Sequence, residues 1–130
     1  YNSGGWGLYL STESLAKVGQ MMLQGGEWEG EQIISKEWIE AMMAPQIMQY
    51  KGVVFGEENQ QAIVNSGDQN QQGYGYQMWC CTNGAVRMDG AWSQFVILFP
   101  KHNSVVVTTA HSANNAGLLK SIWSRLYPNL

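Results

Sequence analysis

Two stretches near the N-terminus repeat apolar side chains at the spacing of an α-helix. Leu15 and Met22 fall on one helical face, and Ser11 before them is suited to cap the helix. The glycine pair that follows should stop this helix. Ser35 is the candidate cap of a second amphipathic stretch, which Pro45 ends because its ring cannot continue the hydrogen-bond ladder. The N-terminal third is therefore predicted to hold two helices.

In the second half of the chain, the pattern changes to alternation and to β-branched runs. Residues Tyr74–Trp79 alternate as a strand does, and turn signals separate the apolar segments that follow them. These segments are Ala85–Met88, Phe95–Phe99 and Ser104–Ala110. Beyond them, Ser112 is a candidate cap for a last helix. Its apolar stripe is Leu119, Ile122, Trp123 and Leu126, and Pro128 ends it.

Together the patterns predict an α+β fold: an antiparallel three-stranded meander with a C-terminal helix plus two N-terminal helices. The turns between strands are short, which forces antiparallel pairing. We expect one domain over residues 1–130, with a helical part at 1–45 and the sheet and last helix at 73–130. Residues 46–72 are rich in Gln, Asn and Gly and are predicted to form a long loop, with room for a short strand near Gly52–Phe55.

Composition narrows the class of protein. Hydrophobic residues make up 45% of the chain and charged residues only 13%, which excludes intrinsic disorder and suggests that part of the surface is covered by something else. A net charge of −3 argues against a nucleic-acid partner. No apolar run is long enough to span a membrane. No basic-then-apolar signal segment opens the chain. The chain starts at Tyr1 and not at Met, so we expect a processed, excised or truncated product.

The cysteines predict neither a disulfide framework nor a metal site. Cys80 and Cys81 are neighbours, and adjacent residues on a strand point to opposite faces, so they would rarely pair with each other. No second pair stands at zinc-ligand spacing, and we expect no cofactor. The compartment stays open between the bacterial cytoplasm and the cell envelope.

Three stretches in the same order resemble the C-terminal part of the serine β-lactamase and penicillin-binding-protein superfamily, and class C-type serine hydrolases most closely. Gly4–Gln20 is similar to the family's GGxGLYLSxxDLAKFGQ helix, and Gly73–Trp79 is similar to its GYGYQxW strand. Arg87–Phe95, with the following Phe99–Pro100 and Val105–Thr109, is similar to its third active-site strand and hairpin. The match spans nearly the whole chain. It implies a partial β-lactamase/transpeptidase-like fold.

The resemblance also implies a function. Members of the family form an acyl-enzyme at the Ser of an S-x-x-K motif, helped by a Tyr from Y-x-N, and hydrolyse amide, ester or lactam bonds. Both motifs lie upstream of the matched region in the family, so we expect this chain alone to be inactive. The family's third motif, K-T-G or H-x-G, falls on Met88, Asp89 and Gly90, which would frame a small-molecule or peptide substrate. The backbone N–H of Ala91 would then complete the oxyanion hole.

The chain departs from the family at two positions of this segment. Met88 stands where the family has a basic residue or His, which puts recognition of a substrate carboxylate in doubt. The neighbouring Arg87 should point to the other face of a regular strand and so would not replace it. Ser93 stands where the family has Gly before Gln94.

Other polar residues allow both a functional and a structural interpretation. Ser14 and Lys17 form a literal S-x-x-K on one helical face, but Ser14 also lies one turn after the cap, where Ser is an ordinary residue, and we favour that reading. We expect His102 and His111 to be exposed or structural. Asp89 could bind substrate or brace its loop, and its spacing from Asp68 does not suggest a carboxylate pair.

The tryptophans, the partner of the chain and its function each allow more than one hypothesis. Trp6, Trp79 and Trp92 could line a cleft and stack on a sugar or acyl group, but core packing is the safer interpretation. A three-stranded remnant would leave an unpaired edge and an uncovered apolar face, so the partner should be the missing N-terminal half or a second copy. The competing functions are a non-catalytic binding module for a peptide or glycan, and a purely structural fragment.

Overall fold

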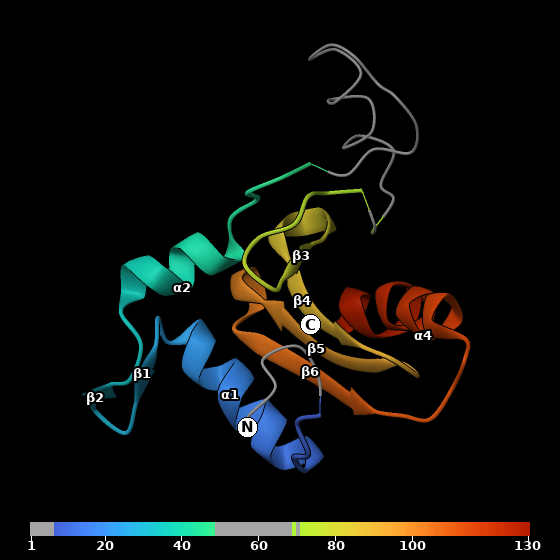
Figure 1. Ribbon diagram of the computed structural model, residues 1–130. Helices are drawn as coiled ribbons and strands as arrows, with labels where there is room; N and C mark the ends of the chain where they lie inside the picture. Colours follow the sequence, from blue (N-terminus) through green and yellow to red (C-terminus); the bar gives the residue numbers. More distant parts are fainter. Residues whose placement is uncertain (1–6, 49–68, 70) are drawn as a thin grey trace.

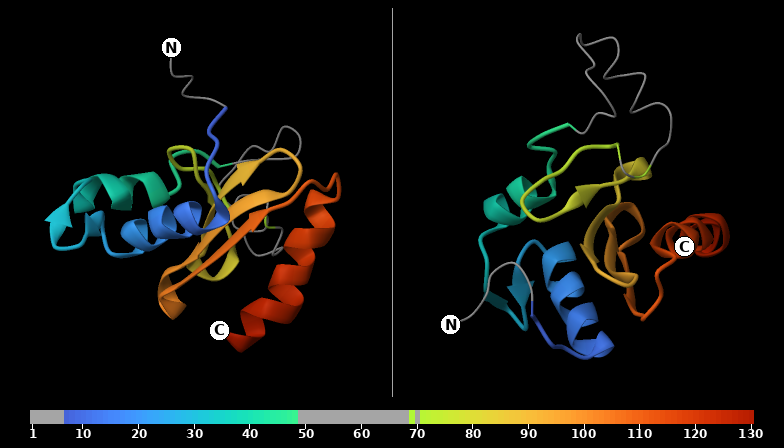
Figure 2. Two further views of the ribbon diagram at one scale, coloured as in Figure 1. Left: turned by 90° about the horizontal axis from the view of Figure 1, so that it is seen from below. Right: turned by 45° about the vertical axis from the view of Figure 1, so that its right-hand side comes forward.

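A computed structural model describes residues 7–48, 69 and 71–130. A four-stranded antiparallel sheet stands between two helical layers: helices α1 and α2 lie on one side, and helix α4 lies on the other (Figures 1 and 2). The α+β class is confirmed. No helix within these described residues is long and apolar enough to cross a membrane.

The two N-terminal helices begin where the sequence predicts them. Helix α1 spans Thr12–Leu23, and the Ser11 hydroxyl accepts a hydrogen bond from the Ser14 N–H at 3.1 Å. Helix α2 spans Lys36–Met43 and is capped in the same way by Ser35. Between them lie two short paired strands, which the sequence analysis did not foresee: β1 at Glu27–Trp28 and β2 at Glu31–Gln32.

The main sheet has one strand more than expected, in the order β3-β4-β5-β6. Its three long strands are β4 at Val86–Gly90, β5 at Gln94–Phe99 and β6 at Ser104–Thr109. Strand β3 is only Trp79–Cys80. It pairs with Val86 and Arg87 of β4, and Trp79 also forms an isolated bridge with Tyr74. Most of the predicted strand over residues 74–79 is turn, because Gln77 adopts a left-handed φ of 59° that breaks regular pairing.

The last helix begins two residues later than predicted. Helix α4 spans Asn115–Ser121, and its cap is Asn114, whose side chain accepts from the Gly117 N–H at 2.9 Å. The predicted cap, Ser112, instead accepts from the Asn114 N–H. The helix continues through a π-helical turn at Ile122–Leu126 and a final 3₁₀ turn at Tyr127–Asn129. The short strand suggested near Gly52–Phe55 lies outside the described residues.

Each face of the sheet buries its own apolar cluster, because side chains alternate along the strands. Phe95, Ile97 and Phe99 of β5 pack against Leu119 and Ile122 on the α4 face. Val96 and Leu98 of the same strand pack on the opposite face with Met22 of α1 and Ile39 of α2. The core therefore runs through the sheet, and β5 is its most deeply buried strand.

Helix α1 approaches the sheet closely at Gly19. A Cβ atom at this position would lie 2.6 Å from Cγ1 of Val105 and 3.1 Å from Cδ2 of Leu98. Such distances are shorter than van der Waals contact, so only a residue without a side chain fits. This contact sets the spacing between α1 and strands β5 and β6.

Candidate functional site

The predicted site segment lies at the end of β4 and in the turn to β5. Met88, Asp89 and Gly90 are the last three residues of β4, and Ala91 begins the turn. Because β3 ends opposite Val86 and Arg87, no strand among the described residues pairs with this stretch on its β3 side. The structure thus brings the four predicted residues together at an open strand edge.

The side chains of this stretch point to opposite faces of the sheet. Met88 lies opposite Val96 and packs in the apolar cluster beneath α1 and α2. Arg87 and Asp89 lie opposite Ile97 and Phe95, on the α4 face. The expectation that Arg87 points away from Met88 is therefore confirmed, and Arg87 does not take the place of the family's basic residue.

Arg87 is the centre of a buried polar cluster on the α4 face. Its side chain is 1% exposed, and its Nε donates to Oδ1 of Asp89 at 2.8 Å. Its Nη1 donates to the Gln69 carbonyl at 2.8 Å and to Sγ of Cys81 at 3.1 Å. The guanidinium also lies 5.3 Å from the ring centroid of Trp79. Asp89 therefore pairs with Arg87 on the same strand, and its two expected roles, binding substrate or bracing its loop, stay predictions.

Burial makes the Asp89 carboxyl and the Cys81 thiol of this cluster favour their neutral forms. Burial raises the pKa of the Asp89 carboxyl, and the Arg87 cation and its hydrogen bond oppose that rise. Burial raises the pKa of the Cys81 thiol to about 11, again against Arg87. Burial also raises the pKa of Cys80. Both thiols stay protonated near neutral pH and are poor nucleophiles.

The turn between β4 and β5 is cross-linked to the segment that leads from β6 into α4. The Trp92 ring stacks on His111, with ring centroids 4.8 Å apart and an interplanar angle of 17°. Ser93 is fully buried, and its hydroxyl lies within hydrogen-bonding distance of Ser112 and Asn115. In the sequence, Ser93 stands out only as a departure from the family's Gly, and nothing points to Asn115. The polar residue Ser93 in place of a family glycine was the one sequence feature that could have indicated this contact.

The other chemically attractive residues have structural partners. The Ser14 hydroxyl lies 2.9 Å from the Ser11 hydroxyl, while Lys17 pairs with Glu13 at 3.1 Å on the exposed side of α1. This S-x-x-K therefore lies in the first turns of a helix, which agrees with the interpretation of Ser14 as an ordinary helix-start residue. His102 is exposed and packs edge-on against Tyr127.

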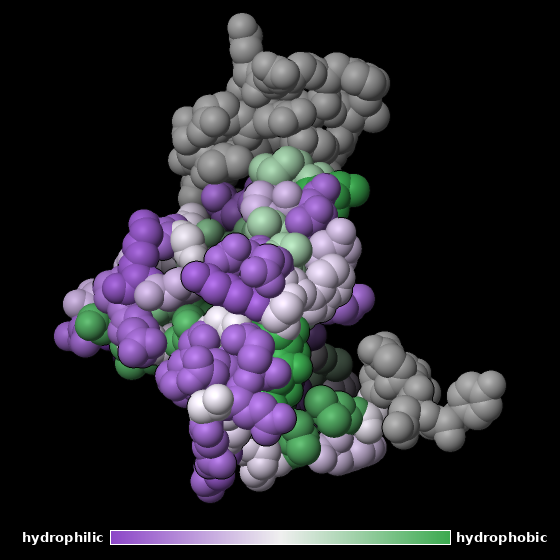
Figure 3. Space-filling model, turned by 90° about the vertical axis from the view of Figure 1, so that its left-hand side faces the viewer, coloured by the Kyte–Doolittle hydropathy of each residue, from purple (hydrophilic) through white to green (hydrophobic). Residues whose placement is uncertain are grey.

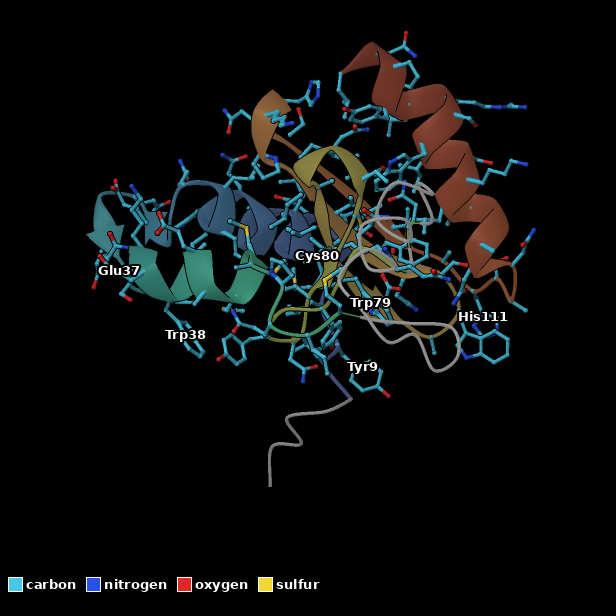
Figure 4. The ribbon with its side chains drawn as sticks, turned by 90° about the horizontal axis from the view of Figure 1, so that it is seen from above. Tyr9, Glu37, Trp38, Trp79, Cys80 and His111 are labelled. Atoms are coloured by element: carbon cyan, nitrogen blue, oxygen red, sulfur yellow. The ribbon has the colours of Figure 1, made fainter. Side chains whose placement is uncertain are left out.

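Exposed aromatic side chains gather on one side of the molecule. Tyr9, Trp38 and His111 lie along the same side in Figure 4, and Trp79 lies above Tyr9, nearer the middle of the view. Trp38 stacks on Tyr76 at 5.0 Å, and both rings remain about half exposed. Trp92 is 50% exposed, so core packing is the wrong interpretation for this residue. Trp79 is partly buried, and Trp6 and Asp68 lie outside the described residues.

A pocket of about 380 Å³ opens elsewhere, between the end of α1 and helix α2. Met22 and Ile39 form its floor, and Lys36 and Glu40 stand at its rim. The surrounding surface is largely hydrophilic with smaller hydrophobic patches (Figure 3). The pocket contains none of the predicted site residues. Within the described part of the chain, no three His, Cys, Asp or Glu side chains are grouped to hold a metal ion.

Two proteins similar to this chain were found, and both are named as hydrolases. No family model matches the sequence. A protein named 6-aminohexanoate-dimer hydrolase from Paenarthrobacter ureafaciens is 29% identical over 106 residues, which cover 78% of this chain and 24% of that protein. The solved structure of a putative 6-aminohexanoate-dimer hydrolase from Bacillus anthracis matches with a TM-score of 0.60 and 22% identity, over 91% of this chain and 27% of that one.

These two matches are similar to the chain in different ways. The Bacillus anthracis structure shares the fold. The Paenarthrobacter ureafaciens protein shares sequence over most of this chain. The chain spans about a quarter of the length of either protein.

Proposed function

We propose that this chain is part of a serine hydrolase of the β-lactamase and penicillin-binding-protein type, and that it supplies one wall of the active site. In this proposal, the backbone edge at Met88–Gly90 aligns the substrate and the Ala91 N–H donates to the oxyanion. The observation that carries the proposal is the open edge of β4 leading directly into an exposed Ala91. The sequence similarity to a hydrolase named for an amide substrate supports it.

The reaction follows from that placement. The hydroxyl oxygen of a serine attacks the carbonyl carbon of an amide, ester or lactam while a general base takes its proton, and the electron pair of the C=O π bond moves to the carbonyl oxygen, which becomes negatively charged. Backbone N–H groups fixed at hydrogen-bonding distance stabilise this charge, and losing one such donor typically costs about 10²–10³ in rate. Among the described residues, no partner is recorded for the Ala91 N–H, so it is available for this role.

The nucleophile and its base would come from elsewhere. Ser14 and Lys17 are held by Ser11 and Glu13, so this chain alone should not form an acyl-enzyme. The open edges of β4 and β6 would pair with the missing N-terminal half of such a hydrolase, or with a second copy of the chain.

Covalent labelling tests this division of roles. The intact mass of about 14.5 kDa should not change after incubation with a fluorophosphonate or a penicillin. Adding the remaining three quarters of a related hydrolase should raise labelling of that partner above what the partner shows alone. An adduct mapped to Ser14 would show that the chain carries its own nucleophile, and an unchanged partner would argue against a shared active site.

A second candidate is a binding module for a peptide or glycan, which the exposed aromatic stacks favour. Stacked, half-exposed rings such as Trp92–His111 and Trp38–Tyr76 suit contacts with sugar or apolar groups. Calorimetric titration of the chain with cello-oligosaccharides and with a panel of short peptides separates the two functions. Affinity without turnover, lost in Trp92→Ala, would favour the module, and no measurable heat with either ligand class would remove it.

A further inference from the structure

The turn that carries Ala91 has an unusual backbone. Trp92 and Ser93 both have φ of 66°, in the left-handed region that side chains other than glycine rarely adopt. A bulky residue such as Trp is an outlier there. Such conformations persist only where surrounding contacts fix them, and they concentrate at functional sites.

Ser93 supplies the contacts that fix this turn. Its side chain is fully buried, and its hydroxyl oxygen lies 3.0 Å from the Ser112 carbonyl oxygen and 2.8 Å from Oδ1 of Asn115. The single hydroxyl proton is therefore shared between two acceptors that belong to the segment entering α4. A glycine, the residue expected here from the family pattern, would relieve the backbone strain but could make neither contact.

Three more contacts hold the same turn, two of them from the segment entering α4 and one from the end of β6. The Ser112 N–H donates to the Trp92 carbonyl at 3.1 Å, and the Thr108 hydroxyl donates to the Ser93 carbonyl at 2.7 Å. The Trp92 ring lies on His111. The turn is thus held from the backbone and from both side chains, although Ala91 and Trp92 themselves are exposed.

We infer that Ser93 is a positioning residue, which holds the turn in its strained form so that the Ala91 N–H stays in a fixed direction. This inference rests on the proposed role of that N–H as an oxyanion donor. Oxyanion donors are effective because they are oriented before the reaction begins. An exposed turn without an internal anchor would lose that orientation. Ser93 acts through Ala91 and does not itself touch the substrate.

Backbone dynamics of the whole chain test the inference. We would measure the ¹⁵N order parameter of Ala91 in the parent chain and in Ser93→Ala, Asn115→Ala and Asn115→Asp. The parent value should be near that of a rigid backbone, about 0.85, and should fall below about 0.6 in Ser93→Ala and Asn115→Ala. Asn115→Asp keeps an acceptor oxygen and should preserve the parent value. Ser104→Ala, which removes a hydroxyl contact to His102 in another turn, is the matched control.

The outcomes separate positioning from general stabilisation. Thermal unfolding of each variant is followed in parallel, because a merely structural role would lower the melting temperature without loosening Ala91. The inference is overturned if Ala91 is flexible in the parent, if it stays rigid in Asn115→Ala, or if Asn115→Asp loosens it equally. The Asn115 pair decides the question if Ser93→Ala does not fold. Neither the order parameters nor the melting temperatures depend on catalysis. A failure of the hydrolase proposal would instead be seen in the covalent labelling experiment.

Discussion

The two faces of the sheet are built by different means. Beneath α1 and α2, Val96, Leu98 and Met88 meet apolar side chains, and close packing at Gly19 sets the distance. On the α4 face, strand β4 carries Arg87 and Asp89, and the turn that follows it carries the hydroxyl contacts of Ser93. Apolar packing tolerates substitutions that conserve volume, whereas a buried polar cluster depends on every partner. The candidate site lies where the polar face meets the open edge of β4.

The largest expected effect is on the polar face. Arg87→Leu removes the buried donor to Asp89 and to the Gln69 carbonyl, although the Asp89 side chain is itself 29% exposed. Each hydrogen bond to a charged group contributes about 1.5–3 kcal/mol, so the loss of these bonds should lower the free energy of unfolding by about 3 kcal/mol. Urea unfolding should show a loss of about that size. A loss below about 1 kcal/mol would mean that the cluster contributes little and that the two faces differ less than they appear.

The Cys81 thiol makes the polar face sensitive to alkaline pH. Its pKa is raised from 9.0 to about 11 in the folded chain, so unfolding releases a proton when the pH lies between these values. The free energy of unfolding should therefore be constant below pH ~9 and fall as pH rises through ~11, by roughly 2–3 kcal/mol at 1.36 kcal/mol per unit. Urea titrations across this range should show the fall. Cys81→Ala should flatten it, and an identical slope in that variant would contradict the assignment.

The apolar face should respond to volume alone. Gly19→Leu forces a side chain into the contact with Val105 and Leu98, and overpacking of this kind costs about 1–3 kcal/mol. The cost should not depend on pH between 7 and 11, in contrast to the Cys81 effect. Val18→Leu, at the partly exposed neighbouring position, is the matched control and should be nearly neutral. Equal losses in the two variants would show that α1 does not pack on the sheet through Gly19.

The apolar face was also the more predictable of the two. Helix caps at Ser11 and Ser35 and the β-branched run of β6 act through neighbours in sequence, so their positions follow from local pattern. The third-motif residues Met88–Gly90 and Ala91 were placed by family resemblance, and their roles stay predictions. The hydrogen bond between Ser93 and Asn115 joins residues 22 positions apart, and no local sequence pattern indicates such a contact. The short strand β3 was overestimated because alternation alone does not reveal the left-handed Gln77.

One measurement tests the central claim most directly, that the Ala91 N–H serves an oxyanion hole. This chain would replace the matching segment of the Paenarthrobacter ureafaciens 6-aminohexanoate-dimer hydrolase, and hydrolysis of the 6-aminohexanoate dimer would be followed in the chimera. Ala91→Pro, which lacks the N–H, should lower kcat by about 10²–10³, while Ala91→Gly should keep it within a few-fold. A folded chimera without activity, or one in which Ala91→Pro and Ala91→Gly are equally active, would contradict the account.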